Sequence, residues 1–156
     1  MKNPFSYQGK RVVITGAYSG VGAATVDLLS SLGASEIIAL DIKEPQGPIS
    51  RYIETNLGDP AAIDAAVAAI DGPVDALFNN AGIAATNPAL EVMKVNYLGV
   101  RRLSEALLPK IPEGGAIAIT ASIAGGQWPQ RLPQIQELLA ITDREQAIAW
   151  IQDHPD

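Results

Sequence analysis

The sequence predicts an α/β fold built on a doubly wound parallel β-sheet with the strand order 3-2-1-4-5. A glycine-containing turn lies between an apolar run at 11–14 and an apolar helical stretch that starts at residue 21. Short apolar runs then alternate along the chain with longer stretches of helical periodicity, as in βαβ units. The strands are almost continuously apolar, which is typical of burial on both faces. Right-handed crossovers between such strands give the predicted order.

The predicted strands are short apolar segments bounded by turns or polar residues. They lie at residues 11–15, 36–40, 51–54, 76–79 and 116–120. Because the carboxyl ends of parallel strands meet at one edge of the sheet, we expect a ligand site beyond that edge.

Helices are predicted between these strands. The helix at 21–32 would end at Gly33, and Asp59 with Pro60 forms a good start for a helix at 60–70. A long third helix is predicted at about 89–108. The first helix is expected to have its apolar residues on one side, namely Val21, Ala24, Leu28, Leu29 and Leu32.

Composition restricts the possible functions. The chain has 156 residues, of which 47% are hydrophobic, so residues 1–156 are expected to form a single domain. The net charge of -6 argues against binding to nucleic acid or to an anionic membrane surface. Residues 1–10 are polar, and the apolar stretch from Val12 is interrupted by glycines, so we expect neither a targeting segment nor a membrane span.

The residue types also restrict the chemistry. No cysteine is present, which excludes a disulfide and suits a cytoplasmic protein. His154 is the single histidine and is expected to be an exposed residue near the C-terminus. A Ser-His-Asp triad or a His-ligated metal site is therefore a poor fit, and no metal is expected. Hydride transfer by a bound cofactor is the chemistry that these residue types leave possible.

The segment 15–22 has the features of a dinucleotide-binding turn. Gly16 permits the tight turn, Gly20 lets the backbone approach a pyrophosphate, and Gly22 lets the helix pack closely on the strand. The helix N-terminus would then bind the phosphates. A purely structural strand-helix junction is the alternative. The predicted cofactor-binding residues of this turn are Gly16, Tyr18, Ser19, Gly20, Val21 and Gly22.

Asp41 follows the second strand, where an acidic residue binds the ribose hydroxyls of the adenosine. Its carboxylate would repel a 2′-phosphate, so NAD is expected rather than NADP. Ile42 is predicted to line the same part of the site.

Three further motifs follow in order. They are Asn-Asn-Ala-Gly at 79–82, Val-Asn-Tyr at 95–97 and Thr-Ala-Ser at 120–122. With the glycine turn, they make essentially the whole chain resemble the short-chain dehydrogenase/reductase family. The resemblance implies a Rossmann fold, a nicotinamide cofactor and a small-molecule substrate.

The resemblance also implies roles for these residues. Asn80, Ala81 and Gly82, together with Thr120, would bind the cofactor. Asn96 would bend its helix and hold a water in a proton relay, although a solvent-facing or carbonyl-bonded asparagine is the alternative. Ser122 would bind the substrate oxygen, and a loop serine bonded to its own backbone is the alternative.

Asn56 and Leu57 follow the third strand at a position where the family usually has aspartate. The Asn56 amide oxygen can still accept a hydrogen bond from the adenine amino group, but more weakly than a carboxylate.

A narrower resemblance begins after Ser122. Residues 124–132, with the Trp128-Pro129 pair, are similar to the branch that contains bacterial coniferyl-alcohol and 3α-hydroxysteroid dehydrogenases, and closer to the coniferyl-alcohol type. In that branch a helical insertion, here 123–156, lies over the substrate entrance. Trp128 and Leu132 would form an apolar wall there, or simply pack. Arg101 and Arg102 are expected on a solvated helix face.

One family feature is missing. The family's catalytic tyrosine stands four residues before a lysine, and no tyrosine of this sequence has a lysine at that offset. We therefore expect the N-terminal part of a protein of roughly 250 residues. The complete protein would be a homo-oligomeric, NAD-dependent oxidoreductase acting on a secondary or allylic alcohol, and these 156 residues alone would be inactive. A catalytically inactive NAD-binding module is the alternative.

Overall fold

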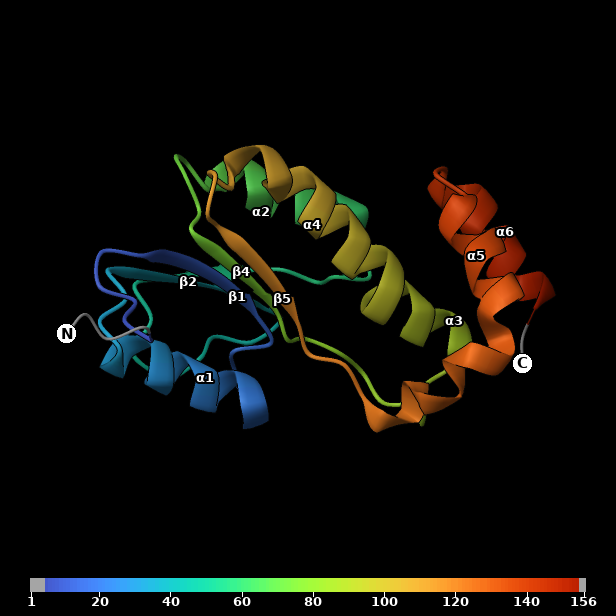
Figure 1. Cartoon of the computed structure of the whole chain (residues 1–156), viewed down its shortest axis with the longest axis horizontal. Coiled ribbons are helices and arrows are strands. Elements are labelled where there is room, and N and C mark those ends of the chain that lie inside the picture. Colours follow the sequence, from blue (N-terminus) through green and yellow to red (C-terminus); the bar gives the residue numbers. More distant parts are fainter. Residues whose placement is uncertain (1–4, 155–156) are drawn as a thin grey trace.

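The five predicted strands form one parallel sheet in the computed structural model, which describes residues 5–154 (Figure 1). The strand order β3-β2-β1-β4-β5 confirms the predicted fold. The strands are β1 (Arg11–Thr15), β2 (Glu36–Asp41), β3 (Arg51–Glu54), β4 (Ala76–Asn79) and β5 (Ala116–Ile119).

Helices cover both faces of this sheet. Helix α1 (Gly20–Ser31) lies on one face, and α2 (Pro60–Ala69) with α4 (Val100–Leu107) lies on the other (Figure 1). The Asp59 side chain caps α2 by accepting a hydrogen bond from the Ala61 N–H at 2.9 Å, as the Asp-Pro pair predicts. No helix among residues 5–154 is long and apolar enough to cross a membrane.

The long predicted helix is interrupted. It consists of α3 (Ala89–Met93), a π-helical segment η1 (Lys94–Gly99) and α4, and a short 3₁₀ turn η2 (Leu108–Lys110) follows. After β5 come a 3₁₀ segment η3 (Ile123–Arg131), helix α5 (Leu132–Ala140) and helix α6 (Arg144–Asp153). Helices α5 and α6 pack beside α3, away from the sheet (Figure 1).

The core divides between the two faces of the sheet because successive side chains of a strand point to opposite sides. Val13, Ile38 and Leu77 are fully buried against the face that carries α2 and α4. Val12 and Ile14 are buried on the face covered by α1. The three central strands are therefore buried on both faces, as their apolar sequences predict.

The same prediction is wrong for the outer strands. All four residues of β5 are exposed, and Ile119 retains 63% of its accessible surface. The two end residues of β3 are also exposed. Each of these strands has a single neighbour in the sheet, and the helices that follow β5 pack on α3 rather than on the sheet.

The apolar side predicted for α1 is buried only in part. Helix α1 buries Gly22, Val26 and Leu29, whereas Val21 and Leu28 are exposed. The close packing of Gly22 on the turn after β1 fixes the rotation of the helix, and this rotation turns Val21 and Leu28 toward solvent. Apolar periodicity alone does not contain that constraint.

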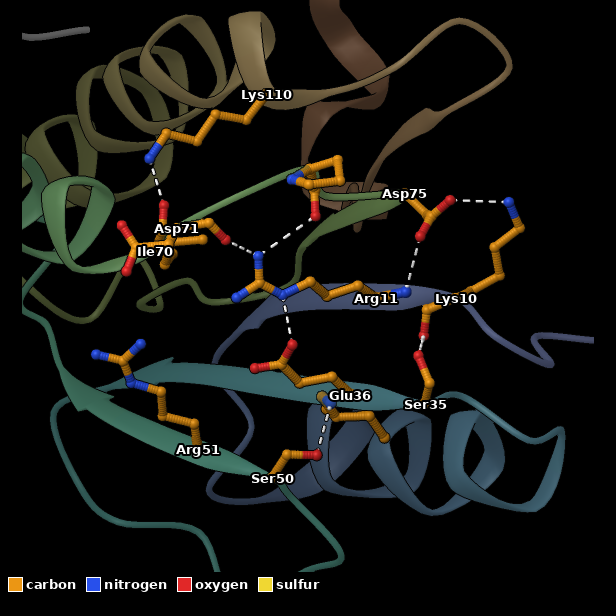
Figure 2. Close-up of polar contacts among 12 residues, drawn as sticks. Lys10, Arg11, Ser35, Glu36, Ser50, Arg51, Ile70, Asp71, Asp75 and Lys110 are labelled. Carbon is orange, nitrogen blue, oxygen red and sulfur yellow. Dashed lines mark hydrogen bonds and ion pairs between the residues drawn. The ribbon is translucent and has the colours of Figure 1, made fainter.

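A polar network holds the amino-terminal ends of the central strands (Figure 2). The Arg11 side chain joins β1 to the Glu36 carboxylate of β2 and to the backbone carbonyls of Asp71 and Pro73. Asp75 accepts hydrogen bonds from the Arg11 backbone N–H at 2.9 Å and from Lys10 Nζ at 2.8 Å. These contacts stabilise the end of the sheet opposite the predicted ligand site.

Asp75→Asn is expected to lower the free energy of unfolding by about 1 kcal/mol at pH 7, the typical value of such a bond. The Arg11 backbone N–H and the Lys10 side chain lower the pKa of Asp75 in the folded protein. The folded state therefore binds this proton more weakly than the unfolded state does. The stabilisation that the Asp75 carboxylate provides is fully present above its pKa in the unfolded state, about 3.9. It is lost as the pH falls through the lower pKa of the folded state.

Urea unfolding of the parent and of Asp75→Asn across pH 3 to 7 measures this effect. The difference between the two proteins should narrow toward pH 3. Glu113→Gln, on an exposed turn, is the control and should show little difference at any pH. If the difference in the free energy of unfolding between the parent and Asp75→Asn does not change with pH, the Asp75 carboxylate does not stabilise the fold in this way.

Candidate dinucleotide-binding site

A cavity of about 570 Å³ opens at the carboxyl ends of the strands. Its walls come from the turn after β1, the end of β2, the loop after β3 and the segments after β4 and β5. Of the predicted cofactor-binding residues, the structure brings to this cavity Gly16, Tyr18, Ser19, Val21, Asp41, Ile42, Asn56, Leu57, Asn80, Ala81, Gly82 and Thr120. Gly20 and Gly22 lie in the same turn but do not line it.

The three glycines of the turn differ in what a side chain at each position would contact. Gly16 has φ +69°, and a Cβ there would lie 2.6 Å from the Ala81 Cα. A Cβ on Gly22 would lie 1.9 Å from the Gly16 carbonyl oxygen, so α1 packs here on bare backbone. Gly20 has φ +58°, but a Cβ there would meet no heavy atom within 4 Å. Gly16 and Gly22 are thus required by packing, while Gly20 leaves open space at the start of α1.

The N-terminus of α1 presents donors at this turn. The first turn of an α-helix has N–H groups without intrahelical acceptors, and the N-cap Ser19 makes no side-chain capping bond. Together with the positive end of the helix dipole, these N–H groups can bind an anion such as a phosphate.

A buried hydroxyl connects the first and fourth strands beneath the cavity. Thr15 Oγ1 accepts hydrogen bonds from the backbone N–H groups of Asn80 and Ala81, both at 3.0 Å. Asn80 Nδ2 donates to the Gly16 carbonyl at 3.2 Å, and Thr120 Oγ1 lies 3.1 Å from Asn80 Oδ1. The Asn80 side chain therefore links the ends of β1 and β5. Thr15 is not among the predicted site residues, and its signal in the sequence is a polar residue that ends an apolar strand.

The Asp41 carboxylate lies at the end of β2 and forms part of the cavity wall. Its Oδ2 accepts from the Tyr18 backbone N–H at 2.9 Å, and its Oδ1 accepts from the Lys43 backbone N–H at 3.1 Å. Lys43 Nζ lies 5.3 Å from the centre of the Tyr18 ring. Lys43 also lines the cavity, although it was not a predicted site residue. In the sequence, only its position two residues after Asp41 indicates this role.

Asn56 and Leu57 form the part of the wall that follows β3. Asn56 Oδ1 accepts from the Gly58 backbone N–H at 2.9 Å, so this amide oxygen already shapes its own turn. Leu57 is buried, and a Cβ on Gly99 would lie 2.3 Å from the Leu57 carbonyl oxygen. The loop after β3 therefore packs directly on the π-helical segment.

Asn96 lies in that π-helical segment. Its Oδ1 accepts from the Ile83 N–H and its Nδ2 donates to the Ile83 carbonyl, both at 2.9 Å. The side chain is therefore bonded to backbone on both sides and fixes the segment that follows Gly82. A π-helical turn widens a helix locally and is frequent at functional sites.

Ser122 lies on an exposed segment and does not line the cavity. Its Oγ accepts from the Ala124 N–H at 3.2 Å and caps the 3₁₀ segment, an arrangement that matches the backbone-bonded alternative. Trp128 and Leu132 are also exposed and lie outside the cavity wall.

The insertion is fixed to the rest of the chain through a small apolar core and one arginine. Leu98 packs with Leu138 and Ile151 in this core. Arg101 Nη1 donates to the Leu139 and Ile141 carbonyls at 3.3 and 2.9 Å. Arg101 also donates to Tyr97 Oη at 3.1 Å and to Glu105 Oε1 at 2.8 Å.

The predicted solvated face is therefore wrong for Arg101. Hydrogen bonds to Glu105 and Tyr97 raise the pKa of Arg101. Arg102 instead pairs with Asp64 of α2. His154 is exposed as predicted, but its ring stacks on Trp150 with the centroids 4.0 Å apart.

Comparison with known proteins identifies the family. A family model described as short chain dehydrogenase matches residues 10–133. The coniferyl-alcohol dehydrogenase of Pseudomonas sp. (strain HR199 / DSM 7063) is 36% identical over 146 residues, which cover 94% of this chain and 57% of that protein. This chain thus spans less than two thirds of that relative.

Two solved structures have the same fold. A short chain dehydrogenase from Burkholderia cenocepacia J2315 in complex with NADP is 27% identical, with a TM-score of 0.66 over 78% of this chain and 58% of that one. An NADH-dependent reductase, A1-R′, complexed with NAD is 24% identical, with a TM-score of 0.65 over 76% of this chain and 62% of that one. Because the family model matches most of the chain and the sheet has the family's strand order, this protein belongs to the short-chain dehydrogenase family.

Proposed function

We propose that this chain binds NAD and forms the cofactor-binding part of an alcohol dehydrogenase. The observation that carries the proposal is the meeting of Asp41 and the glycine turn in one cavity at the carboxyl ends of the strands. An acidic side chain there can accept hydrogen bonds from both ribose hydroxyls and repels a 2′-phosphate. The first turn of α1 would hold the pyrophosphate, and Asn80 to Gly82 would line the cofactor on the side of β4.

NAD held by the turn after β1 and by Asp41 would supply the acceptor for a hydride from the alcohol carbon. Asn80 holds the ends of the strands together, and Asn96 fixes the segment after Gly82, so these residues keep the wall of the site rigid. The Ser122 hydroxyl, which accepts from the Ala124 N–H, would donate its own proton to the substrate oxygen. The insertion 123–156 would cover the substrate entrance.

For the substrate we propose a secondary or allylic alcohol on a bulky apolar body, of the coniferyl-alcohol or 3α-hydroxysteroid type. The similarity to a coniferyl-alcohol dehydrogenase supports this class. The sequence contains no tyrosine four residues before a lysine, so we propose that the proton acceptor of the complete enzyme lies outside these 156 residues. These residues alone would then bind NAD without oxidising alcohol.

The missing pair also favours a second function, a catalytically inactive NAD-binding module. The intact mass of the protein isolated from its natural source distinguishes the two. A mass well above 16.4 kDa, with a Tyr-x-x-x-Lys motif in the additional sequence, supports the enzyme. A mass equal to this chain supports the module.

Asp41→Ala is expected to weaken NAD binding about 10-fold to 100-fold, because a hydrogen bond to a charged group contributes about 1.5–3 kcal/mol. It should also reduce the preference for NAD over NADP, because it removes the repulsion of a 2′-phosphate. Calorimetric titration with both cofactors measures both effects.

Asp41→Asn is the matched control, because it keeps an acceptor for the Tyr18 or Lys43 N–H while it removes the charge. Asp41→Asn should bind NAD more tightly than Asp41→Ala does. Its preference for NAD over NADP should fall by as much as that of Asp41→Ala. An unchanged ratio of NAD to NADP affinity in both variants would contradict the ribose assignment.

A further inference from the structure

The first residue of α6 contacts the loop that follows β3. Arg144 Nη2 donates a hydrogen bond to the Gly58 carbonyl oxygen at 2.9 Å, although 86 residues separate the two in the chain. Gly58 comes directly after Asn56 and Leu57, which line the dinucleotide cavity, whereas Arg144 does not line it. This hydrogen bond therefore joins the insertion to the wall of the proposed cofactor site.

The hydrogen bond from Arg144 holds one peptide group of a short turn. The peptide group between Gly58 and Asp59 presents its carbonyl oxygen to Arg144. The N–H of the same peptide group donates to the Asn56 carbonyl at 3.0 Å, and Asn56 Oδ1 accepts from the Gly58 N–H at 2.9 Å. Because glycine restricts the backbone torsions little, the bond from Arg144 favours one orientation of this peptide group. The position of Asn56 Oδ1 thus depends on a contact with α6.

The start of α6 is itself fixed. Asp143 caps the helix by accepting from the Gln146 N–H at 2.9 Å, and Ala147 is buried in the small core of the insertion. A positive side chain in the first turn of a helix is unfavourable, because the helix dipole places positive partial charge there. The helix therefore does not favour an arginine at residue 144, and the bond to the Gly58 carbonyl gives this side chain a role.

We propose that Arg144 is a positioning residue for the adenine end of the dinucleotide site. An amide oxygen has two lone pairs, so Asn56 Oδ1 can accept a hydrogen bond from the adenine amino group in addition to the one from Gly58. Arg144 holds the turn that carries this oxygen, and the insertion thereby contributes to the affinity for the cofactor. The proposal rests on the proposed function, because it requires NAD to bind in this cavity.

Calorimetric titration of the 156-residue chain with NAD and with nicotinamide hypoxanthine dinucleotide tests this proposal. The second compound has a carbonyl oxygen in place of the adenine amino group, so it cannot donate a hydrogen bond from that position. We expect the parent to bind NAD about 3-fold to 10-fold more tightly than the hypoxanthine compound, the range for one neutral hydrogen bond. Arg144→Ala should remove this preference by weakening the binding of NAD, and the binding of the hypoxanthine compound should change little.

Two further variants serve as controls. Arg144→Lys keeps a positive donor on a long side chain but loses the planar guanidinium, so it should retain part of the preference for NAD. Arg51→Ala removes a comparable bond, from Arg51 Nη1 to the Ala69 carbonyl at 2.9 Å, and neither of these two residues lines the cavity. Arg51→Ala should keep the full preference. Circular dichroism verifies that every variant is folded.

The possible outcomes separate this proposal from the proposed function. If folded Arg144→Ala keeps the preference of the parent, or loses affinity for both compounds equally, Arg144 does not position the adenine contact and the proposal is overturned. Equal binding of both compounds to the parent would also overturn it, while the proposed NAD site would stand. Binding of neither compound to the folded parent would overturn the proposed function, and this proposal with it.

Discussion

Gly22→Ala is expected to lose both stability and dinucleotide binding, although it adds a single methyl group. The added Cβ would lie 1.9 Å from the Gly16 carbonyl oxygen and 2.5 Å from Asn80 Nδ2. Neither atom can move freely, because the Asn80 amide bonds to that carbonyl and is held near Thr120. Helix α1 must therefore move away from β1. Overpacking of this kind costs about 1–3 kcal/mol or more in the free energy of unfolding.

Binding should fall with stability in this variant, because the displaced helix carries the N–H groups that would hold the pyrophosphate. Urea unfolding and calorimetric titration with NAD measure the two effects. Gly126→Ala is the control, since a Cβ at Gly126 meets no heavy atom within 4 Å. Gly126→Ala should keep the stability and the NAD affinity of the parent. Native stability and native NAD affinity in Gly22→Ala would show that α1 does not pack as described.

Gly20→Val is expected to nearly abolish NAD binding for a different reason. A Cβ at Gly20 meets no heavy atom of the rest of the protein within 4 Å, so a substitution there makes no close contact at its Cβ. It would occupy the space where the backbone approaches a pyrophosphate. The backbone at Gly20 has φ +58°, and a non-glycine residue in this left-handed conformation costs about 1–2 kcal/mol.

Gly114→Val separates these two effects. Gly114 has φ +80°, its Cβ would also meet nothing within 4 Å, and it lies in the turn before β5. Both valine variants should lose similar stability in urea unfolding, but only Gly20→Val should lose NAD binding in calorimetry. Near-native affinity in folded Gly20→Val would mean that the turn is only a structural junction.

The sheet was predictable from the sequence because its determinants are local. Apolar runs mark β1, β2 and β4, and Asp59-Pro60 marks the start of α2. The strand order follows from short right-handed connections. The residues around the cavity were predictable for the same reason, since they follow the carboxyl ends of strands in the sequence.

Other features depend on tertiary contacts that no local pattern contains. The rotation of α1 follows from the approach of Gly22 to Gly16, and it overrides the apolar periodicity that includes Val21 and Leu28. Arg101 binds carbonyls 38 and 40 residues further along the chain, and its neighbours in the helix do not indicate these contacts. The π-helical segment is likewise fixed by the contact of Asn96 with Ile83.

Calorimetric titration of the 156-residue chain with NAD and with NADP measures directly whether the cavity beside Asp41 is an NAD site. We expect saturable binding of NAD and binding of NADP that is weaker by at least about 10-fold, because the Asp41 carboxylate repels a 2′-phosphate. Binding of NADP as tight as that of NAD, or no binding of either cofactor to the folded chain, would contradict it.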